Sequence, residues 1–484
     1  MNGLRIVGLG PAGLDRVPAG AMAALTDPAG VVIVRTLHHP AAAELAASRA
    51  VTTCDDLYDS LDDLDAVYAA IAGRVLEVAG SHSVVYAVPG SASVGERAAA
   101  LIVTGANERG IPVDVLPGES FVDLALLAVG VDPLAKGLQI LDGRSLPDPL
   151  PLHVPTLISQ VDTQLALAEV ATSLGKVLDG ETPVVFLDSL GGPNERIERI
   201  PLRRLDELVP GPRTSLFVDP PPVGWFGLVA VNRALRLECP WDRDQTHHSL
   251  LEHLLEEAYE AIEAIGRLGS DAPAGEVDYG AYAEVEEELG DLLLQVVFHA
   301  TLAREAAAFD VEEVAEGIRR KLVHRHPHVF GDVVAHDAET VRSNWETLKS
   351  QEKRRDSLMD DVPRVLPALA RAAKLQRRAS TAGFDWSDTE PVVAKIHEEV
   401  DELDVAAGSA STSHELGDVL FSVVNLARHL DIDPEGALRS ANERFEGRFR
   451  SVEASAVAGG RSLEALSLEE MDELWEAAKL APGT

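Results

Sequence analysis

The chain is poor in cysteine and in basic residues. Its 484 residues include only two cysteines, Cys54 and Cys239, and 42 Lys and Arg against 79 Asp and Glu, for a formal net charge of -37. Two distant cysteines form neither a disulfide framework nor a metal-ligand spacing, so we expect a reducing, cytoplasmic setting. The acidic excess argues against nucleic acid or an anionic membrane as a partner.

Long apolar runs are also lacking. No run approaches the roughly 18 apolar residues that a membrane span requires, and residues 1–5 lead into an apolar strand rather than a signal peptide. Hydrophobic residues (46%) and charged residues (25%) occur at levels ordinary for a globular protein. A chain of this length is expected to fold as several domains, each with its own core.

The first half alternates short apolar runs with longer segments of helical potential. β-Branched residues are frequent in the short runs, which predict strands at 4–10, 31–34, 83–88, 184–187 and 216–218. Helices are expected at 94–108, 121–129 and 161–174. This alternation predicts an α/β layered domain with a parallel or mixed sheet. Prolines around 210–227 indicate a linker and a domain boundary.

Three glycine- or proline-rich turns are expected at strand ends in this half, in segments 8–13, 86–91 and 115–121. Glycine lets backbone N–H groups approach a ligand closely. The first turn is not a Rossmann fingerprint, because Pro11 removes one N–H and the third glycine spacing is absent. By itself it is equally consistent with a tight turn.

The three turns in this order, with segments 35–40 and 139–142, resemble the tetrapyrrole methylase family over residues 3–220. The resemblance implies a two-lobed α/β domain that binds S-adenosylmethionine. It places cofactor contacts in the first two turns, at Gly8, Gly10, Pro11, Pro89, Gly90 and Ser91. The chain departs from the family at Ala12, and at Ser91 and Ala92, where a final glycine and a Gly-Asp-Pro are usual. Methyl transfer and a non-catalytic ligand-sensing or dimer-forming role both stay open.

The second half is predicted to be all α. Helical periodicity predicts helices at 249–266, 282–308, 311–323, 340–355, 362–379, 392–407, 413–430, 434–454 and 467–479.

Carboxylates are concentrated on two consecutive helices of this half. Glu398, Glu399 and Glu402 are spaced to share one helix face, and Glu415 and Asp418 share a face of the next. Five carboxylates brought together repel one another unless a cation lies between them. Oxygen ligands at this density suit Mg²⁺ or Mn²⁺, and Mg²⁺ in turn suits a phosphate substrate.

The acidic pattern occurs twice. Glu256, Glu257 and Glu260 precede Glu288 and Asp291 in the same order. In both copies the acids open an apolar segment, so we expect them near a bundle core, where carboxylates need a partner or a metal. A ferritin-like di-iron site is excluded, because neither acidic stretch contains the Glu-x-x-His that such a site requires. We therefore predict a duplicated cation site.

Histidine clusters elsewhere predict no metal site. His38 and His39 have no third ligand nearby in the sequence, and we assign them no catalytic role. His324, His326 and His328 surround Pro327 without a fourth ligand, which favours a helix-terminating turn.

Five further segments, at 238–246, 325–330, 383–386, 425–430 and 442–449, resemble the MazG family of nucleoside triphosphate pyrophosphohydrolases in its two-module form. The resemblance covers about residues 232–480. It predicts a first helical module at 232–355 and a second at 360–480, after the methylase-like domain at 1–225. The whole chain resembles the known fusion of these two families.

The MazG resemblance implies a homodimeric, Mg²⁺-dependent enzyme, with Mn²⁺ as the alternative metal. It implies hydrolysis of nucleoside triphosphates to monophosphate and pyrophosphate, as nucleotide-pool housekeeping. The implied metal ligands are Glu399, Glu402, Glu415 and Asp418 in the second module, and Glu256, Glu257, Glu260, Glu288 and Asp291 in the first. Glu398 and Glu399 are the implied catalytic residues. Substrate contacts are implied at Lys395, Arg444, Arg448, Trp475 and Lys479.

The second module is expected to be the active one, as in long members of the family. One departure concerns His414, which stands where the family often has an acid. The first module has Glu287 at the equivalent place.

Overall fold

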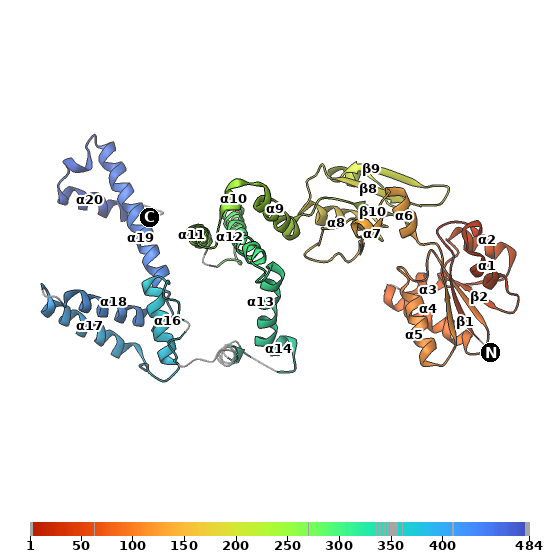
Figure 1. The fold of residues 1–484 in the computed structure, drawn as a ribbon, viewed down its shortest axis with the longest axis horizontal. Coiled ribbons are helices and arrows are strands. Elements are labelled where there is room, and N and C mark those ends of the chain that lie inside the picture. Colours follow the sequence, from red (N-terminus) through yellow and green to blue (C-terminus); the bar gives the residue numbers. More distant parts are fainter. Residues whose placement is uncertain are drawn as a thin grey trace. The chain divides into compact units, whose positions relative to one another are not determined.

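The computed structural model describes residues 3–61, 63–269, 271–333, 337, 340, 341, 345, 348, 357–360, 362–408 and 411–479. The chain divides into two compact units, Met1–Ile318 and Arg319–Thr484. Strands and helices alternate in the N-terminal part, and helices make up the rest (Figure 1). The predicted multidomain fold, α/β followed by helical modules, is confirmed. Among the described helices, none has the length and apolar character needed to cross a membrane.

The first sheet is parallel and has the strand order β3-β2-β4-β1-β5. Its strands are β1 (Leu4–Gly8), β2 (Val31–Val34), β3 (Thr52–Thr53), β4 (Val84–Val88) and β5 (Val113–Leu116). All five residues of β4 are buried, as expected for a central strand that helices cover on both faces. The carboxyl ends of β4, β1 and β5 therefore lie side by side at one edge of the sheet.

Helices cover both faces of this sheet. Alternate residues along the strands point to opposite faces, so Ile6 and Tyr86 belong to one core cluster and Val7 and Ala87 to another. The helices of this lobe are α1 (Ala19–Thr26), α2 (Pro40–Ser48), α3 (Asp55–Ser60), α4 (Leu64–Ala79) and α5 (Arg97–Glu108), with the short 3₁₀ helix η1 (Leu14–Arg16). Residues of α4 and α5 line the first cluster, and residues of α1 and α2 line the second.

The second sheet is mixed and has the order β6-β7-β10-β8-β9. Its strands are β6 (Gln139–Asp142), β7 (Thr156–Ser159), β8 (Pro183–Asp188), β9 (Arg196–Pro201) and β10 (Ser215–Val218). The surrounding helices are α6 (Phe121–Val129), α7 (Pro133–Lys136), α8 (Gln164–Gly175) and η2 (Leu202–Glu207). Residues of α8 and η2 pack on one face, and residues of α6 pack on the other.

A helical part completes the first unit. It comprises α9 (Gly224–Glu238), α10 (Pro240–Asp244), α11 (Leu251–Gly266) and α12 (Tyr279–Glu305), and α13 (Val311–Arg325) crosses the division between the units. Val229 of α9 packs against Val297 and Ala300 of α12. The largely buried Arg236 guanidinium donates to both carboxylate oxygens of Glu305, at 2.8 and 2.6 Å. This pair joins the C-terminal ends of α9 and α12.

The second unit contains α14 (Pro327–Phe330), α16 (Ala368–Ser380), α17 (Thr389–Ala406), α18 (Thr412–His429), α19 (Pro434–Ala458), η3 (Leu463–Ala465) and α20 (Leu468–Lys479). Helices α17 and α18 form a hairpin, and α16 packs against α18. The side chain of Asp388 accepts a hydrogen bond from the N–H of Glu390, which satisfies the start of α17. Asp433 caps α19 in the same way, with Pro434 at its first position.

Five of the strands were predicted, and the strands that were missed are the four edge strands and the central strand β7. The predicted strands are confirmed as β1, β2, β4, β8 and β10, and the structure adds β3, β5, β6, β7 and β9. The expected helices correspond to α5, α6, α8, α11–α13 and α16–α20. The helix expected at 340–355 lies largely outside the described residues.

Two segments differ from the sequence predictions or refine them. The proline-rich connection is shorter than expected, because β10 lies inside the second sheet and α9 begins at Gly224. Helix α13 ends at Arg325 and α14 follows, so the turn expected near His326 is present.

Candidate functional site

The acids of the second module meet where α17 lies against α18. Carboxylate oxygens of Glu399, Glu402 and Glu415 lie within 4.8 Å of one another. His414, Glu415 and Asp418 form a second group within the same limit, so Glu415 belongs to both. The two helices therefore bring the predicted ligands of this module together. An oxygen-rich set of this kind fits a divalent cation.

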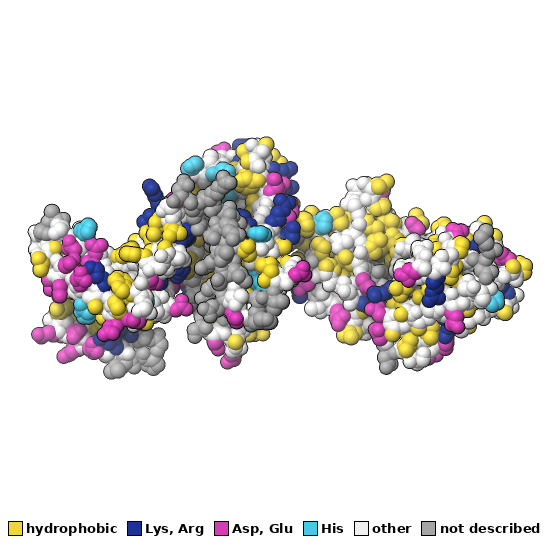
Figure 2. Space-filling model, turned by 90° about the horizontal axis from the view of Figure 1, so that it is seen from below, with side chains coloured by type: hydrophobic (Ala, Val, Ile, Leu, Met, Phe, Trp, Pro, Cys, Tyr) yellow, Lys and Arg dark blue, Asp and Glu magenta, His cyan; other side chains and the backbone are white. Residues whose placement is uncertain are grey.

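Helix geometry places these side chains. Glu399 is 7% exposed and faces α18, whereas Glu398 is exposed beside it. Glu415 lies in the first turn of α18, where the positive end of the helix dipole favours a carboxylate. Acidic side chains, shown in magenta, gather over the C-terminal helices at the left of Figure 2.

Lys395 is the positive charge closest to the acids of α17 in the sequence. Its ammonium lies 2.8 Å from a carboxylate oxygen of Glu398 and 2.8 Å from one of Glu399. The hydrogen bonds to Glu398 and Glu399 raise the pKa of Lys395. Lys395 therefore stays protonated over the physiological range and offsets part of the acidic charge.

A cavity of about 640 Å³ opens beside this group, a size ordinary for a small-ligand site. Lys395, Glu399 and Asp418 line one part of it. Other lining residues come from α16, from the loop before α17 and from the second half of α18: Leu375, Gln376, Phe384, Asp385, Trp386, Phe421, Ser422, Asn425 and Arg428. The cavity thus combines acids, two cationic side chains and an aromatic wall.

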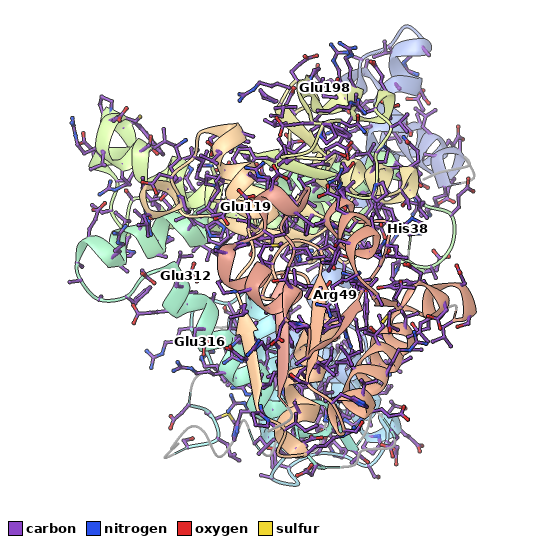
Figure 3. All side chains as sticks on the ribbon, turned by 90° about the vertical axis from the view of Figure 1, so that its right-hand side faces the viewer. His38, Arg49, Glu119, Glu198, Glu312 and Glu316 are labelled. Carbon is purple, nitrogen blue, oxygen red and sulfur yellow. The ribbon has the colours of Figure 1, made fainter. Side chains whose placement is uncertain are left out.

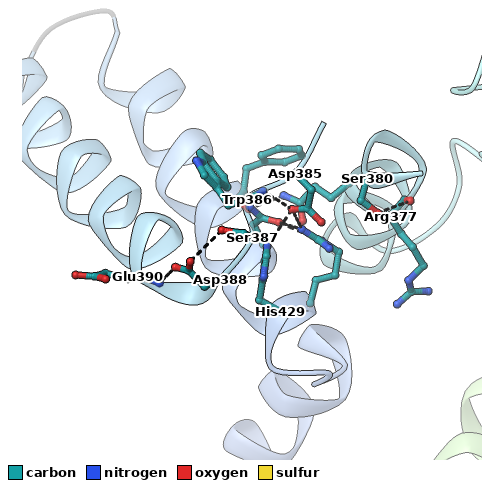
Figure 4. A network of polar contacts seen from close by, with 12 residues as sticks. Arg377, Ser380, Asp385, Trp386, Ser387, Asp388, Glu390 and His429 are labelled. Atoms are coloured by element: carbon teal, nitrogen blue, oxygen red, sulfur yellow. Dashed lines mark hydrogen bonds and ion pairs between the residues drawn. The ribbon is translucent and has the colours of Figure 1, made fainter. Parts of the chain in front are cut away.

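A polar network supports one wall of the cavity (Figure 4). Asp385 accepts hydrogen bonds from Arg428 and, at 3.0 Å, from Nε2 of His429. Arg428 also donates to Oδ1 of Asn425 at 3.1 and 2.8 Å. Burial opposes ionisation of Asp385, but the hydrogen bonds from Arg428 and His429 outweigh it and lower the pKa of Asp385. A carboxylate thus fixes the Arg428 guanidinium at the cavity.

No role was predicted for the residues of this network from the sequence. Asp385, Asn425 and Arg428 lie within the segments at 383–386 and 425–430 that carry the family resemblance. Gln376 and Ser422 lie outside those segments. Their position beside the acids follows from packing between α16, α18 and the loop before α17, which helical spacing alone does not reveal.

Not every predicted residue of this module lines the cavity. Glu398 and Glu402 border a separate depression together with Glu415. Arg444 and Arg448 lie on α19, and Trp475 and Lys479 lie on α20. The ring centroids of Trp475 and Phe445 lie 5.1 Å apart, and the Lys479 ammonium pairs with the Glu476 carboxylate. These last four residues are not among those that line the described cavity.

The first module repeats the hairpin with α11 and α12. Carboxylate oxygens of Glu257, Glu260 and Glu288 lie within 4.8 Å of one another. Burial, then Asp291 and Glu260, raise the pKa of Glu257, and burial, then Glu260 and Asp291, raise that of Glu288. Three of the five predicted ligands therefore form a group here, and Asp291 lies near enough to raise the pKa values of Glu257 and Glu288. Glu256 lies farther out, 3.8 Å from Nδ1 of His253.

The predicted cofactor turns converge in the N-terminal domain. Gly10 and Gly90 form a two-way backbone bridge, with N–H···O distances of 3.0 and 2.8 Å. A Cβ at Gly8 would lie 2.5 Å from the Gly90 carbonyl oxygen and 2.8 Å from the Cα of Gly118. Glycine is therefore required where the three turns touch. The structure brings Gly8, Gly10 and Gly90 together at the carboxyl ends of β1 and β4.

Side chains connect these turns to the second sheet. Arg213 donates to the carbonyl oxygen of Pro11 at 2.7 Å. The Arg16 guanidinium forms an ion pair at 3.0 Å with Glu119, which is labelled in Figure 3. Arg16 also donates a hydrogen bond to the carbonyl oxygen of Gly191. Ser91, in the second turn after Pro89, is buried and contacts the hydroxyl of Ser93 at 2.9 Å.

The adjacent histidines of this domain differ in burial. His38 is exposed (Figure 3), whereas His39 is buried at the start of α2. Burial lowers the pKa of His39 to about 4, so its imidazole is neutral at pH 7.

Two family models match the chain. The model for Tetrapyrrole (Corrin/Porphyrin) Methylases matches residues 3–206. The model for the MazG nucleotide pyrophosphohydrolase domain matches residues 245–330, which include the first acidic hairpin.

Known proteins extend these matches. The nucleoside triphosphate pyrophosphohydrolase/pyrophosphatase MazG of Thermotoga maritima is 44% identical over 256 residues, which are 52% of this chain and 94% of that protein. The uncharacterized protein YabN of Bacillus subtilis is 37% identical over 495 residues, 98% of each chain. The solved structure of uroporphyrin-III-C-methyltransferase from Thermus thermophilus matches 45% of this chain and 94% of that one, with 22% identity and a TM-score of 0.36. The chain therefore belongs to the MazG family of nucleoside triphosphate pyrophosphohydrolases and carries an N-terminal tetrapyrrole methylase domain.

Proposed function

We propose that the chain hydrolyses nucleoside triphosphates to the nucleoside monophosphate and pyrophosphate, and that the α17–α18 hairpin is the active site. One observation favours the second module over the first as the active site. Glu399 and Asp418, from the two acidic groups, line the same cavity as Lys395 and Arg428. A triphosphate needs such a combination, because its negative charge requires cations on one side and an acid-held metal on the other.

Residues of the cavity and of the adjacent carboxylate group would contact different parts of the substrate. Glu399, Glu402, Glu415 and Asp418 would hold a divalent cation, which supplies positive charge that offsets the phosphate charge. Lys395 and Arg428 add fixed positive charge at the cavity wall. Phe384 and Trp386 offer ring faces on which a nucleobase can stack. Glu398 accepts a hydrogen bond from Lys395. It would orient either the Lys395 ammonium or the water molecule that attacks the phosphate.

A homodimer is part of the proposal. Leu416, Leu420 and Val423 are each about half exposed and recur at helical spacing along α18. An apolar stripe of this kind is typical of an interface with another chain. Arg444, Arg448, Trp475 and Lys479 lie on α19 and α20 and do not line the cavity of their own chain. In a dimer, these residues of one copy could reach the nucleotide bound to the other. Light scattering on the full chain tests the dimer, and a monomer at micromolar concentration would remove it.

Product analysis tests the reaction. The purified chain, stripped of metal and then supplied with Mg²⁺ or Mn²⁺, is incubated with a panel of ribo- and deoxyribonucleoside triphosphates. We expect monophosphate and pyrophosphate in equal amounts. Diphosphate and orthophosphate would assign a different hydrolase class, and no turnover with any nucleotide would remove the proposal.

A second function is proposed for the N-terminal domain, where S-adenosylmethionine would bind at the converging turns. The Gly10–Gly90 bridge and the close contact of Gly8 with Gly118 support it, because they bring three backbone turns to one place. Calorimetry of the full chain with S-adenosylmethionine and with S-adenosylhomocysteine tests binding. A change in the rate of triphosphate hydrolysis on adding either compound would favour the ligand-sensing role over methyl transfer.

A further inference from the structure

His414 is the residue of the second hairpin that departs most from an all-oxygen ligand set. It lies in the first turn of α18, directly before Glu415 and four residues before Asp418. Its Nδ1 atom is 2.9 Å from a carboxylate oxygen of Asp418 and 3.9 Å from one of Glu415. The imidazole thus lies among residues that would hold the cation, although the side chain itself is 77% exposed.

The two ligand groups share Glu415. One is made of the carboxylates of Glu399, Glu402 and Glu415, and the other of His414, Glu415 and Asp418. Asp418 and Glu399 line the same cavity. A cation held near Glu415 is therefore within reach of the His414 nitrogen as well as the carboxylates.

We propose that His414 is a nitrogen ligand of the metal centre and makes this centre favour a first-row transition cation such as Mn²⁺ or Co²⁺ over Mg²⁺. The reason is ligand chemistry. Mg²⁺ binds oxygen almost exclusively and keeps its waters, whereas imidazole adds affinity for first-row transition metals. This inference rests on the proposed function, since it concerns the metal of the same site.

The first hairpin serves as an internal reference, because it has a carboxylate where the second hairpin has His414. The first hairpin has Glu287 at the matched place, directly before Glu288, so that copy is built from carboxylates alone. The competing explanation is a surface pair between His414 and Asp418, one helical turn apart, with no part in metal binding.

Metal binding without nucleotide distinguishes the two explanations. We would measure Mn²⁺ and Mg²⁺ affinities of the metal-stripped full chain by calorimetry for the wild type, for His414→Glu and for a matched control, His82→Glu. His82 is an exposed histidine of the N-terminal domain. We expect the ratio of Mn²⁺ to Mg²⁺ affinity to fall about tenfold in His414→Glu and to be unchanged in His82→Glu. An equal ratio in all three proteins would overturn the proposal.

A spectroscopic measurement on the wild type needs no stable variant. Pulsed electron paramagnetic resonance of bound Mn²⁺ should show coupling to an imidazole ¹⁴N nucleus, and His414→Glu should lose it. A wild-type spectrum without ¹⁴N coupling would contradict the proposal. Because neither measurement involves turnover, nitrogen ligation without triphosphate hydrolysis would remove the proposed function and leave this inference standing. Hydrolysis by a centre without nitrogen ligation would do the reverse.

Discussion

The two acidic hairpins have the same backbone plan and different charge environments. In the α17–α18 hairpin, Lys395 lies 2.8 Å from both Glu398 and Glu399. In the α11–α12 hairpin, His253 occupies the matched position, four residues before Glu257. Burial is the largest cause of the raised pKa values of Glu257 and Glu288, and repulsion by the neighbouring acids is the second. From this difference we infer that the carboxylate pattern alone provides a place for a cation. We infer further that a triphosphate also needs nearby cationic side chains and a cavity, which Lys395, Arg428 and the α17–α18 cavity provide.

The hairpins also share features that do not concern charge. Leu289, Leu293 and Val296 form an exposed stripe on α12 at the same spacing as the stripe on α18. The exposed apolar stripe therefore recurs together with the acids in both hairpins. The first hairpin is proposed to have a mainly structural role, and the predictions that follow test this division.

The largest difference is expected between Glu399→Gln and Glu257→Gln. Glu399 is a buried member of the carboxylate group at the cavity, so its loss should lower kcat at least about 100-fold. Glu257→Gln should change kcat less than about threefold, because its group is not proposed to hold the reacting nucleotide. Pyrophosphate release under saturating triphosphate measures both. Equal losses would show that both hairpins are needed for activity, and a loss confined to Glu257→Gln would place the activity in the first hairpin.

A smaller difference is expected between Lys395→Met and His253→Met. Removing Lys395 deletes a fixed positive charge at the cavity, which should lower kcat/KM about 10- to 100-fold. His253 holds the matched place in the first hairpin, and its substitution should leave kcat/KM within about twofold. Steady-state kinetics of the two variants make the comparison, with Lys395→Arg expected to recover part of the loss.

The network behind the cavity should affect binding more than turnover. Asp385→Asn removes the carboxylate that holds Arg428 and His429, so we expect KM to rise about tenfold while kcat changes less. Thr301 occupies the matched place of Arg428 in the first hairpin and donates to the carbonyl oxygen of Val297. Thr301→Val should leave KM unchanged. A fall in kcat with constant KM for Asp385→Asn would place this residue in the chemical step instead.

The smallest expected effect is a pH dependence of the metal-free first hairpin. Glu257 and Glu288 have raised pKa values in the folded chain, so the folded state binds their protons more tightly than the unfolded state. This tighter proton binding adds to the free energy of unfolding in full below the ordinary pKa of 4.5. The contribution is lost as the pH rises through the raised pKa values of the folded state. Glu288→Gln should therefore raise Tm in EDTA at pH 7 and converge with wild type at low pH.

A matched control makes that measurement specific. Glu286 is exposed on the same helix and lies outside the carboxylate group, so Glu286→Gln should leave Tm unchanged. Added Mg²⁺ should stabilise the wild type more than Glu288→Gln, because the variant has lost one ligand. Identical melting curves for all three proteins would mean that these acids do not destabilise the folded chain.

Most central strands and the acidic helix faces could be predicted from the sequence, whereas the edge strands, the central strand β7 and the cavity walls could not. The continuous apolar run of β4 is diagnostic because both of its faces are buried. None of the four edge strands, β3, β5, β6 and β9, is among the predicted strands. In β9, Arg196, Glu198 and Arg199 interrupt the apolar pattern, because one side of an edge strand faces solvent.

The site shows the same division. Glu399 and Glu402 could be placed together because they share one helix face, and Lys395 lies one turn before Glu399. Gln376, Asp385 and Arg428 come from three segments that meet only when α16 packs on α18. Helical spacing carries no information about such contacts. The predicted contacts at Trp475 and Lys479 stay predictions for the same reason.

The most direct test of the division between the hairpins is a crystal structure of the full chain with Mn²⁺ and a triphosphate analogue that has a non-hydrolysable α,β-bridge. Anomalous scattering locates the cation independently of the fitted model. We expect Mn²⁺ between Glu399 and Glu415, with the triphosphate in the cavity lined by Lys395 and Arg428. Mn²⁺ and the analogue bound together at Glu257 and Glu288, with the α17–α18 cavity free of nucleotide, would contradict it.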